Sequence, residues 1–146
     1  MNADVFIDTN VFLYALSDLP EEQAKAERAR QLLLDENWGW SVQVAGEFYH
    51  IATSARRQFR LPHSSAMDYV ETWLNFPTAS LHPSTVVSAL GIRDRFQISY
   101  WDAAIIAAAR ELGCRIIYSE DLIHGQDYDG VKVTNPFLPD PGSQRS

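Results

Sequence analysis

Three large apolar residues run directly into an acid near the start of the chain, in the stretch Val5-Phe6-Ile7-Asp8-Thr9-Asn10. A short continuous apolar run of this kind is typical of a strand buried on both faces, as in a parallel sheet. A helical pattern follows without a gap, from Val11 to Leu16. Asp8 is therefore expected at the carboxyl end of a strand, where open α/β sheets bind their ligands. Because aspartate is also a common N-cap, the stretch alone leaves open that Asp8 only caps the helix.

Further strands and helices alternate along the rest of the chain. Strands are predicted at 40–42, 78–81, 115–118 and 131–134, and helices at 21–34, 44–59, 65–76, 84–96 and 103–109. Strands separated by helices imply βαβ units. The sequence thus predicts an α/β fold, with a central and mainly parallel β-sheet flanked by helices. We expect a single domain from 1 to 138 and a flexible, proline-rich tail from 139 to 146.

Length and composition are those of one globular domain. The chain has 146 residues, of which 46% are hydrophobic and 21% are charged. No apolar run approaches the ~20 residues of a membrane span and no signal-like start is present, so a cytoplasmic protein without a membrane segment is expected. The single cysteine, Cys114, excludes an internal disulfide, fits a reducing compartment and is expected as a small buried residue. The net charge of −7 argues against broad adhesion to nucleic acid or anionic membranes.

Four of the 19 acids lie in apolar surroundings instead of on a solvated face. Asp8 ends the first strand, and Asp121 follows the strand that ends at Tyr118. Glu47 is placed at the border of a buried helix face, and Asp102 stands at the mouth of the apolar helix at 103–109. Each acid alone also has an ordinary structural interpretation, as a cap, a helix-border residue or a turn residue.

Taken together, these acids indicate a cation site. A carboxylate in a low-dielectric setting is costly unless it is paired, hydrogen-bonded or bound to a metal. The sequence has only two lysines, Lys25 and Lys132, and few arginines lie near the four acids along the chain. Mg²⁺ prefers oxygen ligands, and a bound divalent ion can activate water and stabilise charge on a phosphodiester.

Four segments, in order, resemble the PIN-domain nucleases, and most closely the VapC-like toxins of bacterial toxin–antitoxin pairs. They are residues 6–10, 41–48, 99–103 and 118–122, and the closing segments 124–126 and 133–137 fit the same family. The resemblance runs from about residue 4 to residue 138. Any one of these motifs is weak, but four in order and with suitable spacing are a strong signal.

The resemblance implies a metal-dependent endoribonuclease that cleaves RNA and is neutralised by an antitoxin. Asp8, Glu47, Asp102 and Asp121 would be the acidic quartet that holds Mg²⁺ or Mn²⁺. Thr9 and Ser119 would support these carboxylates through their hydroxyl groups, with Asn10 as a polar neighbour. A homodimer is also implied.

The sequence leaves three points open. Glu120 stands beside Asp121, and Asp121 is chosen because it matches the motif position. Arg56, Arg57 and Arg60 form a basic cluster that would contact RNA phosphates or an antitoxin's acidic groups, or would only be a solvated helix end. The alternative function is a catalytically inactive PIN-like scaffold that acts by binding protein or RNA.

Overall fold

A computed structural model describes residues 2–139 and contains a five-stranded sheet. The strands are β1 (Val5–Ile7), β2 (Trp38–Ser41), β3 (Thr78–Ala79), β4 (Ile116–Tyr118) and β5 (Lys132–Thr134). They lie in the order β3-β2-β1-β4-β5, and every neighbouring pair is parallel. The predicted α/β class is confirmed, and the sheet is parallel throughout.

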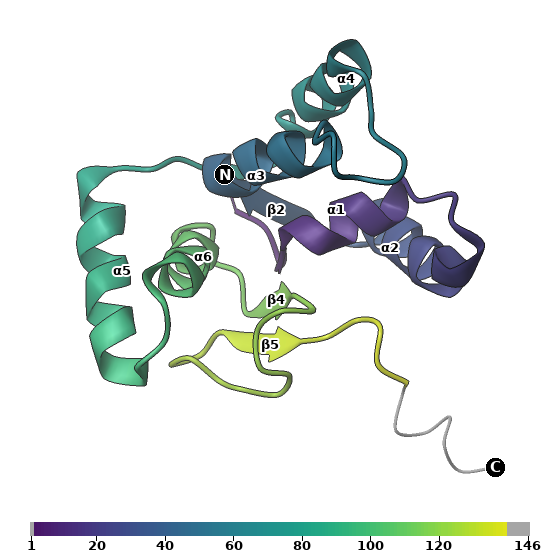
Figure 1. Cartoon of the computed structure of the whole chain (residues 1–146). Coiled ribbons are helices and arrows are strands. Elements are labelled where there is room, and N and C mark those ends of the chain that lie inside the picture. The colour runs from purple at the N-terminus through teal and green to yellow at the C-terminus, as the bar shows by residue number, and fades with distance from the viewer. Residues whose placement is uncertain (1, 140–146) are drawn as a thin grey trace, which may run out of the picture.

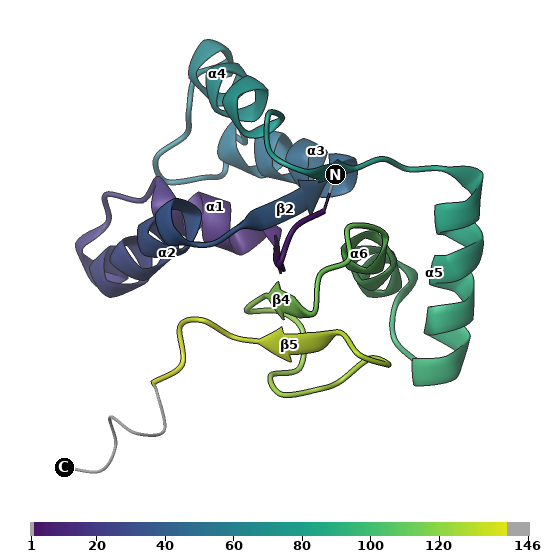
Figure 2. The same ribbon diagram turned by 180° about the vertical axis from the view of Figure 1, so that it is seen from behind.

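Helices cover both sides of this sheet. They are α1 (Thr9–Ala15), α2 (Gln23–Asp35), α3 (Val42–Ala52), α4 (His63–Trp73), α5 (Pro83–Phe96) and α6 (Tyr100–Glu111), with a short 3₁₀ turn at Pro20–Glu22. Helices α1 and α2 lie on one side of the sheet, and α5 and α6 lie on the other (Figures 1 and 2). None of the helices within the described residues has the length and apolar character that a membrane span requires.

The order of the strands places a switch point beside β1. From β1 the chain proceeds to β2 and β3 on one side, and it returns to β4 and β5 on the other. Ile7 pairs with Tyr118 in adjacent parallel strands, so the residues that follow them, Asp8 and Ser119, leave the sheet side by side. Ligands of open α/β sheets bind at such a point, outside the carboxyl ends of the strands.

The core confirms the apolar patterns of the sequence. All three residues of β1 are buried, and so are Ala103 to Ala109 of α6, the helix predicted to lie deep in the core. Cys114 is buried as expected. A cluster of aromatic rings fills the space between the sheet and helices α1, α3 and α4, and it comprises Phe12, Trp38, Trp40, Phe48 and Trp73.

The second strand begins and ends earlier than the predicted 40–42, since β2 runs from Trp38 to Ser41. Trp38 and Gly39 already belong to the strand, and Val42 is the first residue of α3. Gly39 fits a buried strand because the backbone packs closely there. A Cβ at this position would lie 2.7 Å from Leu112 Cδ1 and 2.9 Å from Pro77 O.

Helix α3 is shorter than the sequence pattern predicts, since it ends at Ala52 and not near Phe59. The chain turns back at once: Leu61 N donates to Ala52 O over 2.8 Å and closes the loop between them. Of the predicted tail, only Pro139 is within the described residues; 140–146 lie outside them.

Candidate active site

Asp8 is both the end of a strand and a helix cap. It follows β1 directly, and its Oδ1 accepts a hydrogen bond from Thr9 N over 2.7 Å at the start of α1. Its second carboxylate oxygen, Oδ2, accepts from Ser119 Oγ at 2.8 Å. Asp8 therefore both follows the strand and caps the helix, the two interpretations that the sequence allowed. Its carboxylate lies at the switch point while it caps α1.

Ser119 connects Asp8 to the loop after β4. Its side chain is completely buried, and its Oγ also accepts from Asp121 N at 3.1 Å and from Leu122 N at 3.2 Å. One hydroxyl group thus fixes the half-buried Asp8 and the backbone that carries Asp121. The Thr9 hydroxyl is different: it is the one buried side-chain polar atom within residues 2–139 that has no hydrogen-bond partner.

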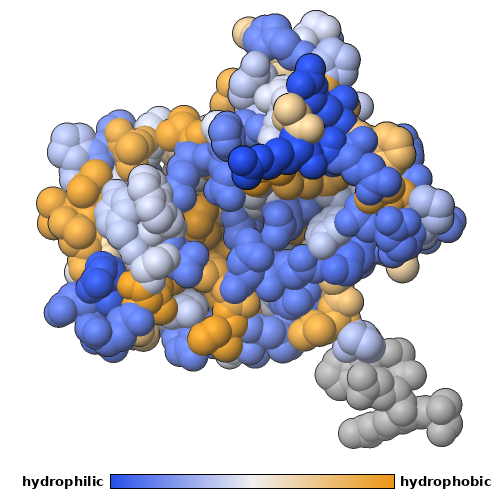
Figure 3. Space-filling view, in the orientation of Figure 1, coloured by the Kyte–Doolittle hydropathy of each residue, from blue (hydrophilic) through white to orange (hydrophobic). Residues whose placement is uncertain are grey.

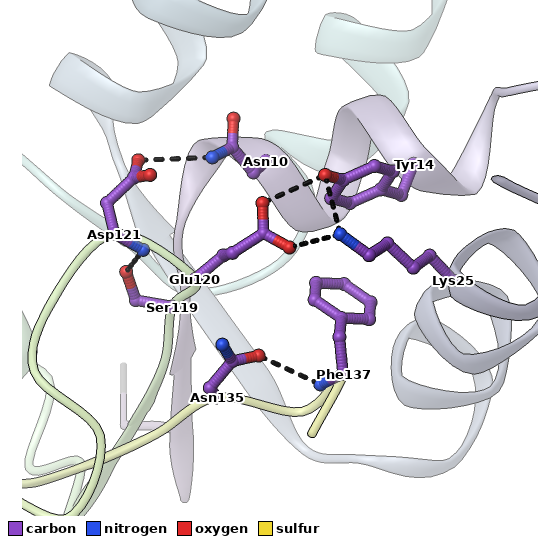
Figure 4. A network of polar contacts seen from close by, with 8 residues as sticks. All are labelled: Asn10, Tyr14, Lys25, Ser119, Glu120, Asp121, Asn135 and Phe137. Carbon is purple, nitrogen blue, oxygen red and sulfur yellow. Dashed lines mark hydrogen bonds and ion pairs between the residues drawn. The ribbon is translucent and has the colours of Figure 1, made fainter. Parts of the chain in front are cut away.

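Asp121 and Glu120 point in different directions from the same loop (Figure 4). Asp121 Oδ2 accepts from Asn10 Nδ2 at 3.1 Å, so Asn10 orients it beside α1. Glu120 instead accepts from Lys25 Nζ at 2.6 Å and from Tyr14 OH at 2.8 Å. Of these two neighbouring acids, Asp121 is the one without a cationic partner.

The remaining two acids come from helices. Glu47 lies on α3 and is exposed, so its expected place at a buried border is wrong, although Val44 and Phe48 of the same helix are buried. Asp102 lies in the first turn of α6, where its N–H donates to the cap, Ser99 Oγ, over 3.1 Å. The cap of α6 is therefore Ser99, which leaves the carboxylate of Asp102 free of that role.

The four acids influence one another electrostatically. The pKa of Asp8 is raised from its ordinary value of 3.8 to about 6, mainly by burial, with smaller contributions from the negative charges of Glu47 and Asp121. The hydrogen bonds from Ser119 and Thr9 oppose this rise because they stabilise the charged form. Burial also raises the pKa of Asp121, and Glu120 and Asp102 raise it further.

The donor set suits a hard divalent cation. It consists of carboxylate oxygens, and within residues 2–139 no lysine, arginine or histidine forms an ion pair with any of the four acids. As the side chains lie here, no three Asp, Glu, His or Cys residues in the described part of the chain are close enough to hold a metal ion together. A cation would therefore have to draw the acids closer, and its charge would offset the burial and the smaller repulsion from Glu47 and Asp121 that raise the pKa of Asp8.

A cleft is lined in part by Asn10, the residue that also donates to Asp121. Its lining includes Asn10, Tyr14, Arg57 and Phe59. On the face shown in Figure 3, hydrophilic residues cover the middle, where the surface is hollowed beneath the projecting α4 region.

The three arginines of the predicted basic cluster differ in what they do. Arg57 donates to Phe59 O at 3.2 Å and to Leu13 O at 3.5 Å, and so holds the loop after α3 against α1. Arg56 and Arg60 are exposed. The arginines lie on this loop and not at the end of a helix.

Sequence reasoning did not single out Tyr14 and Lys25, which bind Glu120. The scarcity of lysine was a signal, because Lys25 is one of two in the sequence. The sequence contained no sign that Lys25 pairs with Glu120, which lies 95 positions further along the chain.

The PIN domain family model matches residues 5–125. The chain belongs to the PIN domain family. Its fold is that of VapC-type toxins, and nuclease activity is typical of PIN-domain toxins. Among curated protein sequences, none matches this PIN domain.

Solved structures of toxins and toxin–antitoxin complexes share the fold. A toxin–antitoxin complex from Klebsiella pneumoniae matches at 15% identity over 92% of this chain and 98% of that one, with a TM-score of 0.65. VapC20 of Mycobacterium tuberculosis, a toxin that cleaves the sarcin–ricin loop, matches at 20% identity over 81% and 90%, with a TM-score of 0.63. FitAB bound to a DNA fragment matches at 16% identity over 93% and 97%, with a TM-score of 0.69.

Proposed function

We propose that this PIN domain is a metal-dependent endoribonuclease toxin, which hydrolyses RNA phosphodiester bonds and is neutralised by a cognate antitoxin. The observation that carries the proposal is the state of Asp8. It is a half-buried acid at the switch point of the sheet, its pKa is raised to about 6, and the negative charges of Glu47 and Asp121 act on it while no cationic side chain within residues 2–139 pairs with it. Such an arrangement costs free energy in the folded protein unless a cation completes it.

Each residue of the site then has a distinct task. Asp8 and Asp121 would hold Mg²⁺ or Mn²⁺ from the ends of β1 and β4, and Glu47 and Asp102 would complete the set from α3 and α6. When bound, the ion supplies charge stabilisation at the scissile phosphate and an activated water. Ser119 keeps Asp8 in place, and Asn10 does the same for Asp121.

RNA is the substrate class that the surroundings favour. A protein with a net charge of −7 repels a polyanion unless a local positive charge attracts it, and the ion would provide that charge at the site. Arg56 and Arg60 would add phosphate contacts from the loop beside the cleft. The cleavage of the sarcin–ricin loop by VapC20 supports a ribonuclease over other hydrolases.

The same features support a protein partner. One structure of related fold is a toxin–antitoxin complex, and an arginine from an antitoxin would pair well with unpaired carboxylates. A homodimer and a cytoplasmic location, where the single cysteine stays reduced, complete the proposal.

The test is cleavage of a panel of total and structured RNAs with Mg²⁺, with Mn²⁺ and with EDTA. The wild-type chain is compared with Asp8→Asn and with Asp129→Asn, a matched control whose carboxylate pairs with Arg95 away from the site. Metal-dependent cutting that Asp8→Asn abolishes and Asp129→Asn retains is the expected result. A folded wild-type protein that binds no metal and cuts no RNA would instead favour the inactive scaffold.

A further inference from the structure

Glu120 is held away from the other acids by a compact set of contacts. Lys25 Nζ lies 2.6 Å from Glu120 Oε2 and 3.2 Å from Tyr14 OH, and Tyr14 OH in turn donates to Glu120 Oε1 at 2.8 Å. Both carboxylate oxygens are therefore engaged. Figure 4 shows this triangle on one side of the loop and the Asn10–Asp121 pair on the other.

Aromatic packing keeps Lys25 in position. Its ammonium group lies 4.7 Å from the centre of the Tyr14 ring and 5.6 Å from that of Phe137, close enough for cation–π attraction. The two rings contact each other edge to face, with centroids 4.9 Å apart. Lys25 is thus fixed by elements from both ends of the chain, unlike the exposed Lys132.

Without Lys25, the loop after β4 would carry two unpaired carboxylates in succession. The Glu120 side chain remains 25% exposed, so solvent and ions reach it. A hard cation accepts any nearby carboxylate oxygen, and a longer acid next to Asp121 would compete with it. Which acid serves the ion is therefore not decided by the sequence of the loop alone.

We infer that Lys25 is a positioning residue: it sequesters Glu120 and leaves Asp121 as the acid of this loop that is available to a divalent cation. The inference rests on the proposed metal-dependent function. Helix α2 contributes no acid to the site, but through Lys25 it determines which carboxylates are available to the ion.

The test measures Mn²⁺ binding by calorimetry, independently of cleavage. Lys25→Met keeps the apolar stem of the side chain and removes its charge, and Lys132→Met is the matched control on β5. We expect Lys25→Met to bind Mn²⁺ roughly tenfold more tightly than wild type, because one negative charge near the ion is left uncompensated. Lys132→Met should bind as wild type does. If Lys25→Met does not fold, Lys25→Gln replaces it and the same outcomes apply.

A double variant and a crystal structure distinguish the sequestration of Glu120 from two other roles of Lys25, namely a role in packing and a general effect of its charge. Lys25→Met/Glu120→Gln should return to the wild-type affinity, which a purely structural role of Lys25 would not allow. In a crystal structure of Mn²⁺-loaded Lys25→Met, a Glu120 oxygen should lie within about 2.0–2.6 Å of the ion, the range of hard-cation bonds to oxygen.

Three results would overturn the inference. They are equal Mn²⁺ affinity of Lys25→Met and Lys132→Met, no restoration in the double variant, or Glu120 still bound to Tyr14 and remote from the ion. Failure of the proposed function is recognised separately, because wild type itself would then bind no Mn²⁺, and the role of Lys25 would fall with it.

Discussion

Ser119 Oγ lies 2.8 Å from Asp8 Oδ2, and this hydrogen bond joins the carboxyl ends of β1 and β4. The same oxygen accepts the N–H groups of Asp121 and Leu122. The position of Asp121 relative to Asp8 is therefore set by one buried hydroxyl group between two parallel strands. The orientation of Asp121 depends in addition on a further side chain, Asn10.

Replacing Ser119 by alanine should damage both stability and the site. The variant leaves two backbone N–H groups without their acceptor, and it removes a hydrogen bond that stabilises charged Asp8. We expect a loss of about 2–3 kcal/mol in the free energy of unfolding. The pKa of Asp8 should rise above about 6, so the acid limb of the cleavage pH profile should move to higher pH.

Ser41→Ala is the matched control for Ser119→Ala. Ser41 is also buried at the end of a strand and accepts one backbone N–H, that of Val44, at 3.2 Å. It should cost about 1 kcal/mol, as the loss of an N-cap does, without moving the pH profile. An unchanged acid limb in Ser119→Ala would contradict the role assigned to this hydroxyl.

Asp8 makes the metal-free protein less stable as the pH rises. Its folded pKa of about 6 exceeds its ordinary value of 3.8, so the folded state binds the proton more tightly than the unfolded state does. Well below pH 3.8 the acid is protonated in both states. As the pH rises from about 4 to 6, the unfolded state ionises Asp8 more readily than the folded state does. Above that range the free energy of unfolding is lower by about 3 kcal/mol than in acid.

Urea unfolding of wild type and Asp8→Asn in EDTA, at pH 4 and at pH 7, isolates this effect, since asparagine does not titrate. The free energy of unfolding of wild type should fall by about 2.4 kcal/mol relative to Asp8→Asn between the two values. An equal pH dependence of the two proteins would mean that the folded state does not raise the pKa of Asp8.

Much of the fold, and the residues proposed for the site, follow from local patterns in the sequence. An apolar run that meets an acid predicts both β1 and the position of Asp8, and parallel strands bring their carboxyl ends to one edge. Tertiary contacts decided the rest. The end of α3 depends on the hydrogen bond from Leu61 to Ala52, and Gly39 belongs to a strand because Leu112 and Pro77 pack against it.

The reason why Glu120 is paired and Asp121 is not also lay beyond local patterns. The pairing depends on Lys25, which reaches Glu120 from a helix 95 residues earlier in the chain. The sequence showed that basic side chains are scarce, but it did not show which acid would form an ion pair with one.

Mn²⁺ should raise the melting temperature of the wild-type protein. An ion that binds only the folded state, at about 100 times its Kd, adds about 2.7 kcal/mol. In a domain of this size that corresponds to about 5–10 °C. Thermal unfolding with Mn²⁺ and with EDTA measures the difference for wild type, Asp8→Asn and Asp121→Asn.

Both site variants should lose most of this increase, while Asp129→Asn should keep it. An equal increase in all four proteins would locate the bound ion elsewhere on the chain and so contradict the assignment of Asp8 and Asp121 as ligands.

The arginines of the loop after α3 should separate into two groups. Arg56→Ala/Arg60→Ala removes two exposed charges. The binding constant K for single-stranded RNA falls as salt rises, and the double variant should make the slope of log K against log salt less negative by about 1.4. Stability should stay within about 0.5 kcal/mol of wild type, as for most surface changes. Binding is measured in EDTA, between roughly 50 and 200 mM salt, so that RNA stays intact.

Arg57→Ala should behave in the opposite way, because Arg57 donates to Phe59 O and Leu13 O and holds the loop. It should lower the free energy of unfolding by about 1 kcal/mol, since Phe59 O loses its donor while Leu13 O keeps the bond from Leu16 N. Arg93→Ala, an exposed arginine on α5, is the control for charge alone. If Arg56→Ala/Arg60→Ala has the same salt slope as Arg93→Ala, the loop does not contact RNA phosphates, and its arginines serve the fold or a protein partner.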